Sequence, residues 1–164
     1  MGVAPFRTCF MDFAQLLIGD AVVADLPVAN KKALFQALGG IAERTMGLTA
    51  KQVTERLHDR ERLGTTGFGG GVAIPHGRIA DQQGIRAAFV RLHRPIDYGA
   101  IDDLPVDLVF MLLSPVDAGA EHLKALAQVS RRLRDRSFVA KLRGAGSPDA
   151  LYALFVNAET RDAA

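Results

Sequence analysis

The longest strongly apolar stretch of the chain runs from Leu108 to Leu113. It is far too short to cross a bilayer, because a membrane-spanning helix needs about 20 apolar residues. The pattern from Val106 to Leu113, which Ser114 and Pro115 end, is typical of a β-strand buried on both faces. Helical and strand patterns alternate along the rest of the chain, with no internal repeat and no low-complexity linker. The sequence therefore predicts one compact α/β domain.

Two helices are predicted in the first half of the chain. The first runs from about Asn30 to Met46, and Gly47 is placed to end it. Thr49 and Gln52 form a capping-box pattern that opens the second helix, which Gly64 closes. The residues expected to face the core recur at helical spacing: Leu34, Leu38, Ile41, Ala42, Val53 and Leu57.

The remaining predicted elements follow in order. Strands are expected at Val72–Ile74 and Ile85–Leu92, before the apolar strand described above. An amphipathic helix is predicted from about Ala118 to Asp135, and a last helix opens at Ser147 and runs to about Val156. Leu123, Leu126, Val129 and Leu133 mark the inward face of the amphipathic helix. The segment up to Val28 gives no clear pattern beyond one turn of helix carrying Phe13, Leu16 and Leu17.

Length and cysteine content exclude several classes of protein. A chain of 164 residues forms a core without disulfide or metal support. Cys9 is the only cysteine and cannot form an internal disulfide, so a cytoplasmic location is expected. The first residues carry neither a secretory nor an acylation signal. We expect one domain over residues 1–164, with a core at about 13–156 and short flexible termini.

The charge distribution gives little support for nucleic-acid binding. The formal net charge is only +2. Asp135 interrupts the one basic cluster, and no aromatic residues are interleaved with it. A solvated helix face or an acidic protein partner is the better interpretation of this cluster, which comprises Arg131, Arg132, Arg134, Arg136, Lys141 and Arg143.

A glycine-rich loop leads into a histidine in the segment RLGTTGFGGGVAIPH, residues 62–76. Glycines leave backbone N–H groups uncovered and adopt positive φ, so an anion can approach the main chain. Pro75 fixes φ directly before His76 and restrains the imidazole. The pattern indicates a histidine presented to a phosphate, with the loop glycines as donors: Gly64, Gly67, Gly69, Gly70 and Gly71.

Nucleotide and metal sites are not supported. Gly71 is followed by Val72, where a Walker A loop requires Lys, and a dinucleotide fingerprint would need Gly or Ala at residue 72 and a strand before the loop. No metal-ligand spacing links any two of the four histidines, which are His58, His76, His93 and His122. We therefore expect no metal and no cofactor.

His76 is instead a candidate phosphate carrier. A neutral imidazole, with an ordinary pKa of about 6.5, is a good nucleophile and can pass a phosphoryl group on. His122 begins the inward face of its helix, near N-terminal amides that favour an anion. Arg60, Thr65 and Thr66 are further candidates near the phosphate.

Ordinary structural roles compete with these hypotheses. A histidine at a strand end is often only hydrogen-bonded, one in the first turn of a helix is often a surface group, and Arg60 could simply be solvated. For His58 and His93 the structural role is preferred, because neither lies in a loop rich in free donors.

The segment Arg60–Gly77 resembles the active-site signature of the fructose/mannitol-type enzyme IIA domain of the bacterial phosphoenolpyruvate-dependent phosphotransferase system (PTS EIIA type-2). The similarity runs from roughly Phe13 to Phe155 and is greatest for the single-domain nitrogen-branch form. Further matches follow in order at Pro95–Asp102, Pro105–Leu113, His122-Leu123 and the helix through Leu133.

The resemblance implies a mixed β-sheet flanked by helices and a phosphotransferase role. It implies that His76 accepts a phosphoryl group on Nε2 from the phosphohistidine of an NPr/HPr-type carrier. His122 would bond the phosphoryl oxygens and Arg60 would neutralise them. The phosphate-binding set it suggests is Thr65, Thr66, Gly69 and Gly71. The chain departs from the pattern at Thr65, where Ser is common, at Asp59, and at Gly70, which replaces Asn and is expected to loosen the loop.

The sequence is compatible with three functions for this protein. The first is a nitrogen-branch regulator whose phosphorylation changes its binding to targets such as potassium-transport or sensor-kinase components. The second is a sugar-specific enzyme IIA that passes phosphate to a separate IIB protein. The third is a scaffold protein that works without phosphorylation; the intact His76, His122 and Arg60 argue against it.

Overall fold

The computed structural model describes residues 12–18 and 20–162; Cys9 and the outermost residues of the predicted flexible termini lie outside this part. Helices and strands do not alternate one by one along the described chain, as the sequence patterns suggested, because five strands follow one another in the middle and three helices follow them. In order they are α1 (Phe13–Leu16), β1 (Val22–Leu26), α2 (Lys31–Met46), α3 (Ala50–Arg62), β2 (Gly67–Gly69), β3 (Val72–Ala73), β4 (His76–Ile79), β5 (Arg86–Ile96), β6 (Val106–Pro115), α4 (Gly119–Leu133), α5 (Arg136–Gly144) and α6 (Pro148–Asp162).

The strands form one mixed sheet in the order β1-β5-β6-β3-β2, with β4 also paired to β6. β5 pairs antiparallel with β6, whereas β3 and β4 both run parallel to β6. β6 is the central strand, and residues 108–114 of it are all buried. The prediction that this apolar run forms a strand buried on both faces is confirmed.

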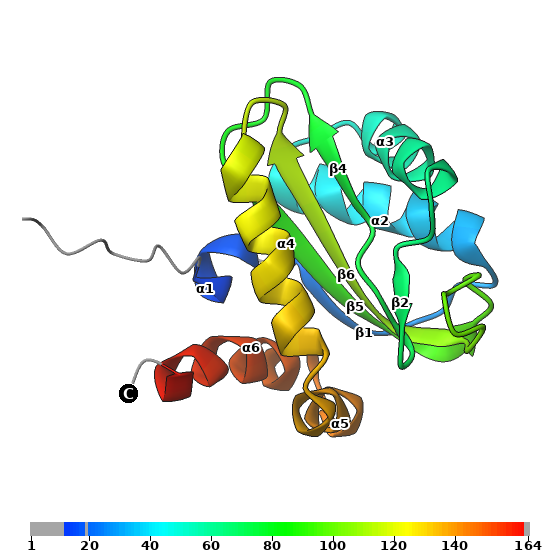
Figure 1. The fold of residues 1–164 in the computed structure, drawn as a ribbon, viewed down its shortest axis with the longest axis vertical. Coiled ribbons are helices and arrows are strands. Elements are labelled where there is room, and N and C mark those ends of the chain that lie inside the picture. The colour runs from blue at the N-terminus through cyan, green and yellow to red at the C-terminus, as the bar shows by residue number, and fades with distance from the viewer. Residues whose placement is uncertain (1–11, 19, 163–164) are drawn as a thin grey trace, which may run out of the picture.

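Helices cover both faces of the sheet (Figure 1). Phe110 and Leu112 of β6 pack in a core with α1, α4, α5 and α6, whereas Val109 and Met111 pack in a second core with α2 and α3. This alternation follows from the two-residue period of a strand. The expected mixed α/β fold with flanking helices is confirmed.

The start of α2 and the entry into α3 show how the helices begin. Asn30 accepts a hydrogen bond from the backbone of Ala33 at 2.8 Å, and Gly47 ends α2 in the left-handed conformation, as predicted. Thr49 precedes α3 but makes no side-chain capping bond, so the predicted capping box is wrong. Leu57 and Val53 are buried as expected.

Other elements differ from the predictions. β1, β2 and β4 were not predicted, and Asp135 does not belong to α4 but caps a separate helix, α5, by accepting from Ser137 and Phe138. α6 continues past Val156 to Asp162. Leu123 was expected to face inward but is 65% exposed. The buried face of α4 consists of His122, Ala125, Val129 and Leu133.

Candidate active site at the start of strand β4

His76 is the first residue of β4, directly after the break at Pro75 between β3 and β4. Its Nδ1 lies 2.8 Å from the carbonyl oxygen of Ile74. A carbonyl only accepts, so Nδ1 carries the proton and, in the neutral ring, Nε2 carries the lone pair. Nε2 is therefore the ring nitrogen whose lone pair is available for chemistry.

Arg60 lies in the last turn of α3, next to His76. Its Nε donates to Nε2 of His76 at 3.1 Å, and its Nη1 donates to the carbonyl of Gly64 at 2.9 Å. The helix end and the following turn thus hold the guanidinium against the imidazole. Arg60 and His122 are the two residues proposed to act with His76, and Arg60 is the one that forms a hydrogen bond with its ring.

His122 comes from the first turn of α4 and is only 5% exposed. Its ring centroid lies 5.6 Å from that of His76. Nδ1 of His122 lies 2.5 Å from Oγ of Ser114, which is fully buried in β6. The structure therefore brings together the three residues predicted for the chemistry: His76, His122 and Arg60.

The surroundings of both histidines favour the neutral form of the ring. Burial lowers the pKa of His76, and the positive charges of Arg60 and Arg78 act in the same direction. Burial, followed by the charges of His76 and Arg78, lowers the pKa of His122 to about 4. A neutral ring keeps its lone pair, which nucleophilic attack on phosphorus requires.

Arg78 and Ser114 are neighbours of the site that the sequence did not point out. Arg78 follows His76 by two residues in β4, so both leave the same face of the strand, and its Nη1 donates to the carbonyl of Val116 at 3.3 Å. Ser114 pairs with Arg78 in the sheet register. The two-residue period of a strand could have pointed to Arg78, and the hydroxyl that directly follows the apolar run could have pointed to Ser114.

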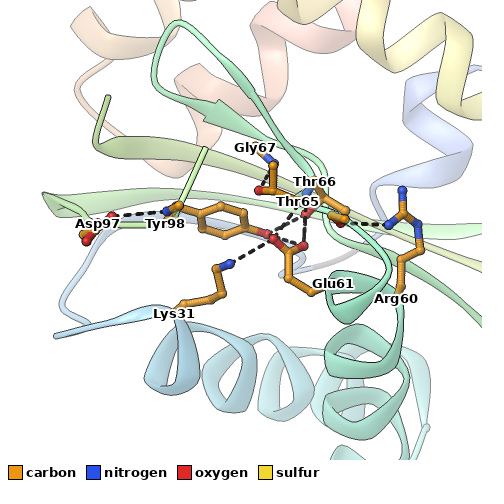
Figure 2. A network of polar contacts seen from close by, with 10 residues as sticks. Lys31, Arg60, Glu61, Thr65, Thr66, Gly67, Asp97 and Tyr98 are labelled. Carbon is orange, nitrogen blue, oxygen red and sulfur yellow. Dashed lines mark hydrogen bonds and ion pairs between the residues drawn. The ribbon is translucent and has the colours of Figure 1, made fainter. Parts of the chain in front are cut away.

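Thr66 belongs to a neighbouring network that Figure 2 shows. Its hydroxyl lies 2.5 Å from the Glu61 carboxylate and 2.6 Å from the Tyr98 hydroxyl, and Lys31 binds Glu61 at 2.9 Å. Burial alone would raise the pKa of Glu61, but the hydrogen bonds from Thr66 and Lys31 outweigh it and leave that pKa below its usual value. The Thr66 hydroxyl is thus engaged with Glu61 and Tyr98, not with His76.

Thr65 also bonds locally, because its hydroxyl accepts from the backbone of Gly67 at 3.1 Å. Both threonines follow Arg60 and Glu61 closely in the chain. The network fixes the turn after α3 and, through it, the position of Arg60. In this structure the hydroxyls of the two predicted phosphate-binding threonines are therefore engaged in hydrogen bonds beside the site.

Gly69 and Gly71 flank the tip of the β2–β3 hairpin and have positive φ of 110° and 81°. Directly after the turn, Val72 of β3 lies beside Leu108 of β6, whereas His76 lies beside Leu112. At about 3.3 Å per residue, the turn and the imidazole are on the order of 13 Å apart. The structure does not bring the amides of Gly69 and Gly71 to His76.

The glycine turn is anchored at its middle residue. The Gly70 amide donates to Asp102 at 2.9 Å, and Arg143 of α5 donates to the Gly70 carbonyl at 2.8 Å. Arg143 also binds both oxygens of Asp107. These hydrogen bonds connect the tip of the β2–β3 hairpin to Asp102 and to Arg143 of α5. In this structure the loop is therefore held at Gly70, where a looser loop was expected.

The other two histidines lie apart from the site. The ring of His58 contacts Phe35, with centroids 4.8 Å apart, and His93 is exposed on β5. Across residues 12–18 and 20–162, no three His, Cys, Asp or Glu side chains gather as a metal ligand set. Within the same residues, no helix has the length and apolar character to cross a membrane.

Comparison with known proteins identifies the family. Residues 15–158 match the family described as phosphoenolpyruvate-dependent sugar phosphotransferase system, EIIA 2. The nitrogen regulatory protein of Bradyrhizobium diazoefficiens is 44% identical over 144 residues, which cover 88% of this chain and 94% of that protein. A PTS system fructose-specific EIIA component of Haloferax volcanii is 39% identical over 143 residues, which cover 83% of this chain and 89% of that protein. The crystal structure of nitrogen regulatory protein IIA-Ntr from Neisseria meningitidis matches with a TM-score of 0.79 and 36% identity, covering 85% of this chain and 96% of that one. The chain therefore belongs to the EIIA type-2 family of the phosphotransferase system, and it resembles the nitrogen regulatory members.

Proposed function

We propose that this protein is a phosphocarrier that accepts a phosphoryl group on Nε2 of His76. The donor is the phosphohistidine of an NPr/HPr-type carrier protein. The observation that carries the proposal is the pair of hydrogen bonds on His76, from Nδ1 to the Ile74 carbonyl and from Arg60 to Nε2. They fix the tautomer and place a cation at the nitrogen where the phosphoryl group is to arrive.

In the transfer, the Nε2 lone pair attacks phosphorus of the donor phosphohistidine. A new N–P bond forms, the donor's N–P bond breaks, and its electron pair returns to the donor imidazole. The Ile74 carbonyl stabilises the positive charge that develops on the His76 ring, because it accepts from Nδ1–H. Such transfers depend mainly on positioning and charge neutralisation.

Arg60 must change partner during this step. Its Nε–H covers the Nε2 lone pair in the unphosphorylated protein. When the donor arrives, the guanidinium turns from the ring nitrogen to the phosphoryl oxygens, to which it forms charge-assisted bonds. His122 lies 5.6 Å away, ring to ring, and bonds an oxygen on the other side of the phosphoryl group.

We infer a regulatory output for the phosphate, by analogy with the similar nitrogen regulatory proteins. Leu63 is 84% exposed beside the turn that Arg60 holds, and Leu123 is exposed next to His122. A dianionic phosphate beside such apolar side chains changes both charge and desolvation at a docking face. Targets such as potassium-transport or sensor-kinase components would then bind according to the phosphorylation state.

The fructose-specific relative supports a second candidate, a sugar-specific enzyme IIA that passes its phosphate to a IIB protein. A chase separates the two. The phosphorylated protein is mixed with a fructose-type IIB protein, and the phosphate on each is followed by mass. We expect the phosphate to stay on the protein, and rapid transfer to IIB would favour the sugar role.

Phosphate acceptance is tested by incubating the protein with enzyme I, an NPr or HPr carrier and phosphoenolpyruvate, then measuring intact mass. We expect an acid-labile gain of one phosphate in the wild type. His76→Ala should lose acceptance completely with the fold intact, and His122→Ala should accept slowly.

The matched control is His93→Ala, which removes an exposed histidine from β5 and should label like the wild type. Full labelling of His76→Ala would refute the assignment. No labelling of the wild type with either carrier would favour the scaffold role.

A further inference from the structure

Ser114 is the only buried serine among the described residues, and it lies on the central strand β6. Its relative exposure is 0%, and its Oγ lies 2.5 Å from Nδ1 of His122. The contact joins the strand beneath the site to the first turn of α4. The proposed transfer does not require this hydroxyl directly.

The hydrogen-bonding chemistry of the pair determines the direction of this bond. A serine hydroxyl carries its own hydrogen, and a buried donor needs an acceptor. In the described part of the chain, Nδ1 of His122 is the one partner that Ser114 Oγ contacts. If Nδ1–H donated to the serine, the hydroxyl hydrogen would be left without an acceptor. The hydroxyl therefore donates, Nδ1 accepts, and the proton of the neutral ring sits on Nε2.

The other ring nitrogen of His122 remains accessible. Among the described residues, the buried side-chain N and O atoms without a hydrogen-bond partner comprise Oε1 of Gln82 alone. Nε2 of His122 has no protein partner and is not in that group, so it keeps contact with solvent. An N–H is thus available on the ring that lies 5.6 Å from the His76 ring.

We propose that Ser114 is a positioning residue that holds His122 as the Nε2–H tautomer, so that the second histidine meets the phosphoryl group as a hydrogen-bond donor. The two neighbouring histidines are then held in opposite tautomers. His76 presents a lone pair at Nε2 because its Nδ1–H is bound by a carbonyl, and His122 presents a proton at Nε2 because its Nδ1 is bound by a hydroxyl. The functional part of this inference rests on the proposed phosphoryl transfer, whereas the tautomer itself does not.

The test is long-range ¹H–¹⁵N correlation spectroscopy of the unphosphorylated protein at pH 7, which reads the tautomer of each ring. We expect His122 as Nε2–H with a hydrogen-bonded Nδ1, and His76 as Nδ1–H. In Ser114→Ala, the Nδ1 signal of His122 should move to that of a nitrogen without a donor, with the His76 signals unchanged. The control Thr45→Ala, which removes a hydroxyl bonded to Ile41 in α2, should change neither ring.

Two results would overturn the proposal: a wild-type His122 with its proton on Nδ1, or an Nδ1 signal that Ser114→Ala leaves in place. The wild-type spectrum alone decides the first, whatever the variant does to folding. In the phosphorylation assay, Ser114→Ala should accept phosphate several-fold more slowly, as the fraction of rings in the competent state falls. If the wild type accepts no phosphate at all, the proposed function fails while the spectra still test the tautomer.

Discussion

Arg60 and Arg78 bring two positive charges to the two histidines from different elements. Arg60 donates to Nε2 of His76, and Arg78 leaves β4 on the same strand face as His76. Both charges lower the pKa of His76, and that of Arg78 also lowers the pKa of His122. A site that disfavours a protonated imidazole is suited to a dianionic phosphoryl group.

Arg78→Gln tests the second charge. Phosphate acceptance should slow about tenfold. This is less than the loss of about 10²-fold or more in rate that removal of a buried preorganised donor causes, because Arg78 is exposed. The pKa values of His76 and His122 should both rise, since a nearby positive charge is lost. NMR titration of the histidine rings measures this, with Arg44→Gln on the exposed side of α2 as control. Unchanged pKa values in Arg78→Gln would contradict this assignment.

The pKa of His122 predicts a pH dependence of stability. Its folded pKa of about 4 lies below the unfolded value of about 6.5. Between these values the unfolded chain binds a proton that the folded ring does not, so the free energy of unfolding falls as pH is lowered from 6.5 towards 4. Urea unfolding at several pH values should show a shallower fall in His122→Gln. Equal slopes for the two proteins would place the His122 pKa near its ordinary value.

At the scale of elements, the contact between α2 and α3 fixes where Arg60 lies. Gly39 of α2 sits directly against α3, because a Cβ added there would lie 2.5 Å from Oγ1 of Thr54 and 2.7 Å from the Ala50 carbonyl. The next residue, Gly40, has nothing within 4 Å of such an atom. The two adjacent glycines therefore have different reasons to be present.

Alanine substitutions separate these reasons. Gly39→Ala should lower the free energy of unfolding by about 1–3 kcal/mol, because the methyl group forces the helices apart. Gly40→Ala should raise it by about 0.5–1 kcal/mol, because alanine favours the helix and meets no neighbour. Chemical denaturation measures both. A stabilised Gly39→Ala protein would show that α2 and α3 are not packed closely at this point.

The elements also show what the sequence can predict. The helices α2, α3 and α4 and the strand β6 follow from strong periodicity and apolar content. β1 was missed because the pattern before Val28 is weak, and β2 because glycine-rich residues are typical of a loop. β4 was missed because a four-residue strand beginning with His and Gly lacks apolar alternation. The glycine-rich loop and Pro75 pointed to His76, and Arg60 was a candidate by its position near that loop. The family resemblance then gave the specific role of each. The contacts of Thr66 and the distance of the glycine turn depend on tertiary packing that no local pattern encodes.

For the whole molecule, the sheet divides the interior into two cores, and the site lies where elements from both faces meet. α3 supplies Arg60 from one face and α4 supplies His122 from the other, with β4 and β6 between them. Phe155 of α6 joins the core on the α4 face. Its ring lies 4.9–5.6 Å, centroid to centroid, from the rings of Phe13, Phe89, Phe110 and Phe138.

Phe155→Ala should lower the free energy of unfolding by about 3–5 kcal/mol, because it leaves a cavity among these rings. The rate of phosphate acceptance per folded molecule should not change, because none of the α6 side chains that the structure describes belongs to the site. Denaturant unfolding and the mass assay, carried out on the same samples, measure the two effects. A slowed transfer in the folded fraction would show that this core also controls the site.

Nδ1 of His76 donates its hydrogen bond to the main-chain carbonyl of Ile74, whereas the hydrogen-bond partner of Nδ1 in His122 is the side chain of Ser114. A codon change at residue 74 replaces the side chain but leaves the carbonyl in place. The tautomer of the nucleophile is thus robust to mutation, and that of its partner can be altered by a single substitution at residue 114. Among descendants of this sequence, variation in phosphoryl-transfer rate is accordingly expected to arise at the second histidine before it arises at the first.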